Sequence, residues 1–173
     1  MGRCTLAFCF HQNNIRSSDE LGDLKNFDKA VIRLRTSGYS EYLPFGFLGR
    51  AAFRRSIGDW EGAARDLDEV EEIALPGPMR VFLCDIALER ARLALARSEA
   101  FAPLSWLPDH GLPKPEMPDA DEVAQLKAEA ARNLADSRRL IDSCGYRRRE
   151  EELVELEAVL TDLRRFADLP PRV

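Results

Sequence analysis

The stretch 58-GDWEGAARDLDEVEEIA-74 decides the fold of this chain. Gly58 and Asp59 interrupt a helical pattern, and apolar residues recur after them at steps of three and four, the spacing of one face of an α-helix. The residues from 42 to 56 carry the same period on the other side of the interruption. The stretch therefore predicts two helices joined by a tight turn.

Helical periodicity continues along the chain, and no segment shows the sustained alternation of a β-strand. The expected helices span residues 21–37, 42–56, 60–74, 79–97, 119–143 and 148–167. The acids at 119–122 are typical of a helix start, and Gly145 is typical of a helix end. The sequence thus predicts an all-α fold with six or seven helices.

Composition narrows the classes of function. The chain has 173 residues, of which 45% are hydrophobic and 32% charged, which suits one folded domain and excludes a disordered chain. Its 30 acidic against 25 basic residues leave a net charge of −5, so we expect no nucleic-acid partner. No apolar run approaches the ~20 residues of a membrane helix, so no membrane partner is expected either.

Four cysteines and two histidines bear on metal and redox chemistry. None of the cysteines forms a C-x-x-C pair, and with so few histidines the spacing of zinc ligands is missing, so neither a metal nor a cofactor is expected. Such cysteines are typical of a reducing environment, which predicts a cytoplasmic location. No nucleophile can be placed beside a base from sequence, and we therefore expect no enzyme.

Ten prolines punctuate the chain, and five of them fall between residues 103 and 118. Proline costs a helix interior about 3 kcal/mol, so this cluster marks an insertion at 98–119 within a helical domain at 21–167. The insertion also contains aromatic and aliphatic residues, and it either packs on the helices or acts as a flexible linker. Residues 1–20 and the tail at 168–173 lie outside the expected domain.

Internal repeats connect three of the expected helices. Each copy has a small or short residue, a large one four positions later and a small or medium one three further on. This pattern suits the close packing of two helices along one seam. The copies consist of Asp23, Phe27 and Ala30; of Ala63, Leu67 and Val70; and of Ala130, Leu134 and Ser137. The first copy is the most divergent, because an aspartate replaces its small residue.

These residues resemble a tetratricopeptide-repeat protein, with the best-matching unit at residues 44–76. Its Gly58-Asp59-Trp60 is similar to the family's turn between helix A and helix B, and Phe47 matches an aromatic residue early in helix A. Arg50 and Arg54 depart from the pattern, since the family usually has a leucine and a tyrosine there. The repeat-packing residues that the resemblance implies are Phe47, Gly58, Trp60, Ala63, Leu67, Val70, Ala130 and Leu134.

The resemblance implies a right-handed α-α superhelix of antiparallel helix pairs. Tyr42-Leu43-Pro44, Met79-Arg80-Val81-Phe82-Leu83 and Gly145-Tyr146-Arg147-Arg148 add a looser similarity over residues 27–157. They look like the degenerate repeat arrays at the C-terminal end of large bacterial signalling or NTPase proteins. The phosphate-binding loop G-x-x-x-x-G-K is absent, so only the repeat portion of such a protein would be represented.

In such repeats the A helices line a concave surface where extended peptides bind. Charged residues on the expected A helices could clamp a carboxylate there: Arg50, Arg54, Arg55, Arg80, Asp85, Glu89 and Arg90. The resemblance therefore implies a non-catalytic protein–protein interaction or scaffolding module, with a protein or peptide as its partner. A regulatory sensor that binds a small ligand or signalling peptide is the alternative. The same charges could instead form the solvent-facing sides of amphipathic helices.

Two features near the C-terminus carry interpretations of their own. An apolar stripe consists of Leu153, Leu156, Leu160 and Leu163. It either caps the helical stack or forms a homodimer seam. The three arginines at 147–149 precede three glutamates at 150–152, which fits a local role, because acids are favoured at a helix start and bases at a helix end.

Overall fold

Six α-helices form the described part of the chain in a computed structural model, which covers residues 21–38, 40–77, 79–102, 112, 115–162, 165–166 and 169. They are α1 (Leu21–Thr36), α2 (Leu43–Ile57), α3 (Trp60–Ala74), α4 (Arg80–Ser98), α5 (Ala120–Cys144) and α6 (Glu150–Leu160), with short 3-10 helices η2 (Ser40–Tyr42) and η3 (Arg147–Arg149). No strand occurs among these residues, so the all-α prediction is confirmed. The predicted N-terminal segment 1–20 and most of the predicted tail lie outside the described residues.

Side-chain caps and glycines set the helix ends close to where the sequence predicts them. The Asp59 carboxylate accepts a hydrogen bond from the backbone N–H of Gly62 at 2.9 Å, and Asp119 caps α5 in the same way. Gly58 ends α2 with φ 85° and Gly145 ends α5 with φ 72°, left-handed conformations that most side chains disfavour. The tight turn predicted between the second and third helices is therefore present.

The last helix is shorter than the sequence predicts. It ends at Leu160 rather than near residue 167, and Asp162 has a φ of 56°. A right-handed helix does not continue through a left-handed residue. The apolar periodicity beyond Leu160 therefore belongs to a segment that leaves the helix, and Phe166 of this segment is buried.

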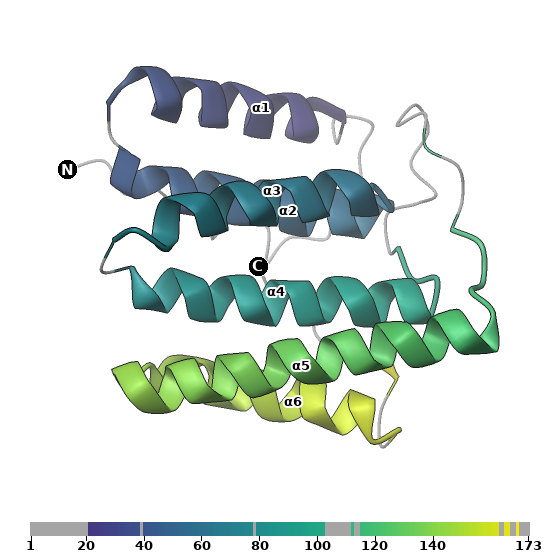
Figure 1. The fold of residues 1–173 in the computed structure, drawn as a ribbon. Coiled ribbons are helices and arrows are strands. Elements are labelled where there is room, and N and C mark those ends of the chain that lie inside the picture. The colour runs from purple at the N-terminus through teal and green to yellow at the C-terminus, as the bar shows by residue number, and fades with distance from the viewer. Residues whose placement is uncertain are drawn as a thin grey trace.

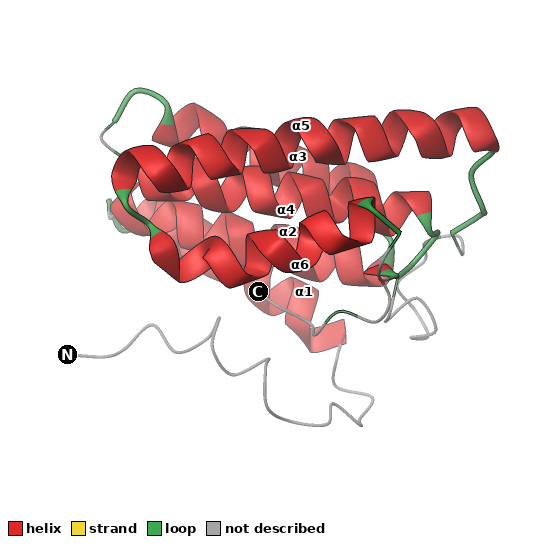
Figure 2. Ribbon diagram, turned by 90° about the horizontal axis from the view of Figure 1, so that it is seen from below, coloured by secondary structure: helices red, strands yellow, loops and turns green. Residues whose placement is uncertain are grey.

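The helices run alternately in opposite directions, with α2, α4 and α6 pointing one way and α1, α3 and α5 the other (Figure 1). Each helix contacts the next along the chain, and α4 also contacts α2 and α6. The view in Figure 2 places α3 and α5 toward one side of α4 and α2 and α6 toward the other. Helix α4 therefore lies at the centre of the stack, and every residue from Ala91 to Ala96 is buried.

Two groups of buried apolar side chains both include residues of α4. One contains Phe47 and Leu67, and the other contains Leu134. Trp60 packs on the first group, while Gly58 forms the turn before it. Six residues of the repeat pattern are buried: Phe47, Ala63, Leu67, Val70, Ala130 and Leu134.

Both ends of the insertion pack on the helices. Ala102 is buried, and a Cβ atom placed on Gly58 would meet the Ala102 Cβ at 3.5 Å and the Pro115 Cγ at 3.4 Å. Phe101 packs edge-on against Phe166, with 6.1 Å between the ring centroids. The two ends of the insertion therefore cover the turn between α2 and α3 and the segment after α6, while residues 103–111 between them lie outside the described residues.

Gly58→Ala should lower the free energy of unfolding by about 1 kcal/mol, because an alanine is strained at the left-handed φ of this turn. Gly77→Ala is the matched control, since a Cβ there would make only an ordinary contact with the Met79 Cγ at 3.6 Å. Urea unfolding followed by circular dichroism compares the two variants. Equal stability of both would show that the turn does not depend on the left-handed glycine.

Candidate functional site

The face formed by α2, α4 and α6 carries a row of buried charges. The Arg55 Nε donates a hydrogen bond to the Glu89 Oε1 at 2.6 Å, and these two side chains are only 10% and 9% exposed. Arg92 pairs with Glu152 at 2.9 Å, and both of these side chains are 6% exposed. The first pair joins α2 to α4 and the second joins α4 to α6, so α4 supplies one charge of each sign.

Arg149, in η3, extends this row toward the start of α4. Its guanidinium pairs with the Asp85 Oδ1 and with the Glu152 Oε2, both at 2.8 Å. We call the following six residues the charge ladder: Arg55, Asp85, Glu89, Arg92, Arg149 and Glu152. Three cations balance three anions in it. Because each charge has an opposite neighbour, the ladder avoids the large cost of an unpaired buried ion.

Burial shifts pKa values within the charge ladder. It raises the pKa of Asp85 above its usual range, although Arg149 beside it acts in the opposite direction. It lowers the pKa of Arg92, against the effect of Glu152 and Glu89. For Arg149, burial lowers the pKa, but Asp85 and Glu152 outweigh that effect and the pKa is raised. The fold therefore favours the neutral form of Asp85 more than water does.

The α2–α4–α6 face has a depression of about 40 Å³ between the charge ladder and neighbouring side chains of α2 and α4. A cavity needs about 10–15 Å³ of such volume to hold one water molecule, so the depression has room for only a few waters. Asp85 and Glu89 line this depression, where they bind Arg149 and Arg55.

The segment after α6 covers one end of the same face. The backbone N–H of Phe166 donates a hydrogen bond to the Glu99 Oε1 at 2.7 Å. The centre of the Phe166 ring lies 5.9 Å from the Arg55 guanidinium carbon, within the range of a cation–π interaction. This contact helps to bury Arg55 and the pair that it forms with Glu89.

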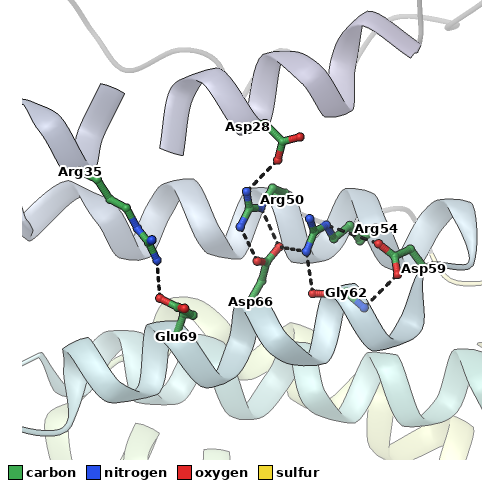
Figure 3. A network of polar contacts seen from close by, with 8 residues as sticks. All are labelled: Asp28, Arg35, Arg50, Arg54, Asp59, Gly62, Asp66 and Glu69. Carbon is green, nitrogen blue, oxygen red and sulfur yellow. Dashed lines mark hydrogen bonds and ion pairs between the residues drawn. The ribbon is translucent and has the colours of Figure 1, made fainter. Parts of the chain in front are cut away.

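A second network joins α1, α2 and α3 around Asp66, a residue that is only 2% exposed (Figure 3). Arg50 donates two hydrogen bonds to the Asp66 carboxylate, at 2.9 and 2.6 Å, and a third to Asp28 at 2.7 Å. Arg54 pairs with the Asp66 Oδ2 at 3.3 Å and donates to the carbonyl oxygen of Gly62 at 3.0 Å. The two arginines that depart from the repeat pattern therefore bind a buried carboxylate on the next helix.

A cleft of about 430 Å³ lies between α3, α4 and α5. The ends of α3 and α5 and the start of α4 meet there, at the left of Figure 1. Its lining includes apolar side chains of α4 and α5, among them Leu83, Ala87 and Leu140. Leu75, which is 62% exposed, also lines it. The cleft is therefore roughly ten times larger than the depression on the other side of α4.

Two of the residues predicted to bind a partner, Arg80 and Arg90, line this cleft. Arg90 pairs with Asp68 at 2.7 Å and with Glu71 at 2.8 Å, both from α3. Arg80 is exposed, and its guanidinium makes no ion pair with any residue that the structure describes. The other predicted residues lie elsewhere: Arg50 and Arg54 around Asp66, and Arg55, Asp85 and Glu89 in the charge ladder.

Sequence reasoning misses Asp66, Arg92 and Glu152, although all three are buried and paired. One signal points to them: each stands next to or among apolar residues on the inner side of a helix, where a charge requires a partner. Such a signal indicates that a partner exists. It does not identify the partner, because the two members of each pair come from different helices.

The local interpretation of the arginine run at 147–149 is incomplete. Arg147 does pair with nearby acids, Asp142 at 3.4 Å and Glu150 at 3.3 Å. Arg149, however, binds Asp85, which lies 64 residues away in sequence. The run therefore combines a local helix-end role with a contact that fixes η3 on α4.

The apolar stripe near the C-terminus packs within the chain. Leu153 and Leu156 are completely buried, and Leu160 packs against the same group of side chains. Leu163, the fourth member, lies outside the described residues. Burial of the stripe against α4 and α5 is the arrangement that a capping helix requires.

Cys84 is the most buried thiol among the described residues, with its sulfur 3.4 Å from the Ser137 Oγ. Burial raises the pKa of this thiol to about 11. The thiolate is the reactive form of cysteine, so a raised pKa leaves little of it at neutral pH. Cys84 is therefore a core residue rather than a nucleophile.

Glu89→Gln should lower the free energy of unfolding by about 3 kcal/mol, because it leaves Arg55 as a buried charge without its carboxylate. Glu61→Gln is the control, since Glu61 forms only an exposed pair with Arg65 at 3.8 Å and should contribute less than about 0.5 kcal/mol. Urea unfolding at neutral pH measures both variants. A loss for Glu89→Gln no greater than that of the control would contradict a buried ion pair.

Asp85→Asn should cost less than about 1 kcal/mol at neutral pH, because Arg149 keeps Glu152 as its partner. A raised pKa means that ionisation of Asp85 disfavours the folded state, and that stability is lost as the pH rises through the folded pKa. The asparagine variant should therefore gain stability relative to the unmodified chain as the pH rises above about 4, the usual pKa of aspartate. Urea unfolding across the acidic range tests this trend, and the opposite trend would contradict it.

The described part of the chain contains no group of three His, Cys, Asp or Glu side chains arranged to hold a metal ion. None of its helices is long and apolar enough to cross a membrane.

Comparison with known proteins gave no match, whether to family models, to curated proteins or to solved structures.

Proposed function

We propose that this chain is a non-catalytic protein–protein interaction module that binds a peptide or partner domain in the cleft between α3, α4 and α5. The observation that carries the proposal is the cleft itself, about 430 Å³ of space lined by apolar side chains and by charges. Protein interfaces combine a desolvated apolar centre with a polar rim. At the cleft, Leu75 is an exposed apolar side chain and Arg80 is an exposed charged one.

The α2–α4–α6 face is the weaker candidate, because its charges bind one another. A ligand there would have to separate a pair such as Arg55 and Glu89, and loss of one partner from a buried pair costs several kcal/mol. The depression of about 40 Å³ is too small to bury much of a ligand in compensation. We therefore assign partner binding to the side of α4 opposite the groove that the repeat resemblance implies.

We further propose that the helices form a right-handed α-α superhelix of the tetratricopeptide-repeat type. The alternating helix directions and the contacts of α4 with both α2 and α6 support this arrangement (Figure 1). The buried residues Ala63, Leu67 and Val70 also support it, since they occupy the small, large and medium positions of the repeat. In such a superhelix, α3 and α5 are B helices of successive repeats, and the cleft lies between them.

A sensor that binds a small ligand is the second candidate. The volume of the cleft falls within the range of about 300–1,000 Å³ that small-molecule sites occupy. Leu75 favours a peptide instead, because 62% of this apolar residue is exposed beside the cleft. A peptide that extends beyond the cleft would cover Leu75, whereas a small ligand inside it would leave Leu75 in water.

Selection of random phage-displayed peptides on the full chain tests the proposal. We expect enriched peptides whose binding to the chain is weakened about tenfold by Ala87→Leu, because the added side chain fills space at the floor of the cleft. Fluorescence anisotropy with labelled peptides measures the affinity. A thermal melt of the variant establishes that it remains folded.

Ala135→Leu is the matched control, since it adds the same side chain at an exposed position of α5 outside the cleft. It should leave peptide binding unchanged. Two results would contradict the proposal: no enriched peptide on the folded chain, or peptides that bind the Ala87→Leu variant as tightly as the unmodified chain.

A further inference from the structure

We infer that the cleft between α3, α4 and α5 takes a segment in which a carboxylate stands next to an aliphatic side chain, with the carboxylate on Arg80. This inference rests on the proposed function and adds the chemistry of the partner. Other charged side chains of the cleft form ion pairs within the fold, whereas Arg80 is exposed beside apolar side chains.

The anionic groups on the α3 side of the cleft are already bound. Glu71 and the adjacent Asp68 both pair with Arg90, whose side chain is 26% exposed. A basic ligand would have to displace Arg90 from these carboxylates and would leave a partly desolvated guanidinium without its partners. The α3 side therefore discriminates against a basic ligand.

The α5 side carries a pair that a ligand can replace. Arg139 pairs with Asp136, its neighbour three residues earlier on the same helix, and these side chains are 79% and 50% exposed. Such exposed pairs are weak, because water screens both charges. A ligand carboxylate near Arg139 can therefore compete with Asp136 at little cost.

Arg80 is the cation of the cleft that the fold leaves available. It is exposed, and across the described residues its guanidinium has no acidic partner. It also opens α4, whose first turn contains no acid and whose N-cap Met79 makes no side-chain capping bond. The partial positive charge of this helix start adds to that of Arg80. The ends of α3 and α5 contribute partial negative charge nearby, but the full charge on Arg80 exceeds it.

Apolar side chains flank Arg80 and define the second half of the ligand. Leu83 follows Arg80 by three residues, so the two share a face of α4, and both line the cleft. Leu75 and Leu140 approach from α3 and α5. A segment whose carboxylate binds Arg80 therefore places its neighbouring side chain against Leu83 and Leu140.

The test compares the peptides that phage selection enriches on the unmodified chain with those enriched on Arg80→Glu. We expect glutamate or aspartate beside leucine, isoleucine or valine on the unmodified chain, and lysine or arginine at the acidic position on the variant. A representative acidic peptide should bind Arg80→Glu about tenfold more weakly, because attraction becomes repulsion. Arg80→Gln, which removes the charge without reversing it, should weaken binding about threefold.

Arg65→Glu is the matched reversal, at an exposed position of α3 outside the cleft, and should keep the acidic preference. Enrichment without an acidic preference, or a preference that survives both Arg80 variants, overturns the inference and leaves the proposed function standing. Failure to enrich any peptide on the folded chain contradicts the proposed function, and the inference falls with it. Circular dichroism establishes that each variant keeps its helices.

Discussion

Two opposite charges, three residues apart on the most buried helix, constrain this fold. Glu89 and Arg92 lie in α4 among side chains that are almost all buried, and an ion without a partner is very costly there. Glu89 binds Arg55 of α2, and Arg92 binds Glu152 of α6. The positions of α2 and α6 on α4 are therefore fixed by ionic geometry as well as by apolar packing.

The two sides of α4 consequently differ in chemistry. On the α2–α4–α6 face, cations and anions are equal in number within the charge ladder, and Phe166 covers its end at Arg55. On the other side, α3 and α5 leave a cleft with apolar side chains and with Arg80 exposed at its edge. Charges that stabilise the stack are thus separated from charges that remain available to a partner. This separation is the physical basis for assigning partner binding to the cleft.

Local signals predict most of the fold, because caps and turns act over a few residues. Gly58 and Gly145 end helices where the sequence predicts, whereas α6 stops at Leu160, because the left-handed residue that follows overrides the apolar periodicity. The candidate site depends on contacts between helices, which no local pattern encodes. Arg149 belongs to a run typical of a helix end, yet it binds Asp85 from 64 residues away. The cleft likewise depends on how far apart α3 and α5 lie, which no local pattern shows. Of the residues that line it, only Arg80 and Arg90 were predicted to bind a partner.

The most direct test is nuclear magnetic resonance of the arginine side chains. It shows whether the guanidinium groups of the charge ladder are held rigidly by their ion pairs while that of Arg80 moves freely. Rotation about the Nε–Cζ bond and hydrogen exchange of the Nε–H report how firmly each guanidinium is held. Arg55 and Arg149 both donate through Nε to buried carboxylates, so we expect slow rotation and a protected Nε–H for both. Arg80 should show fast rotation and rapid exchange. Rapid rotation and exchange at Arg55, together with a restricted Arg80, would contradict this division of charges.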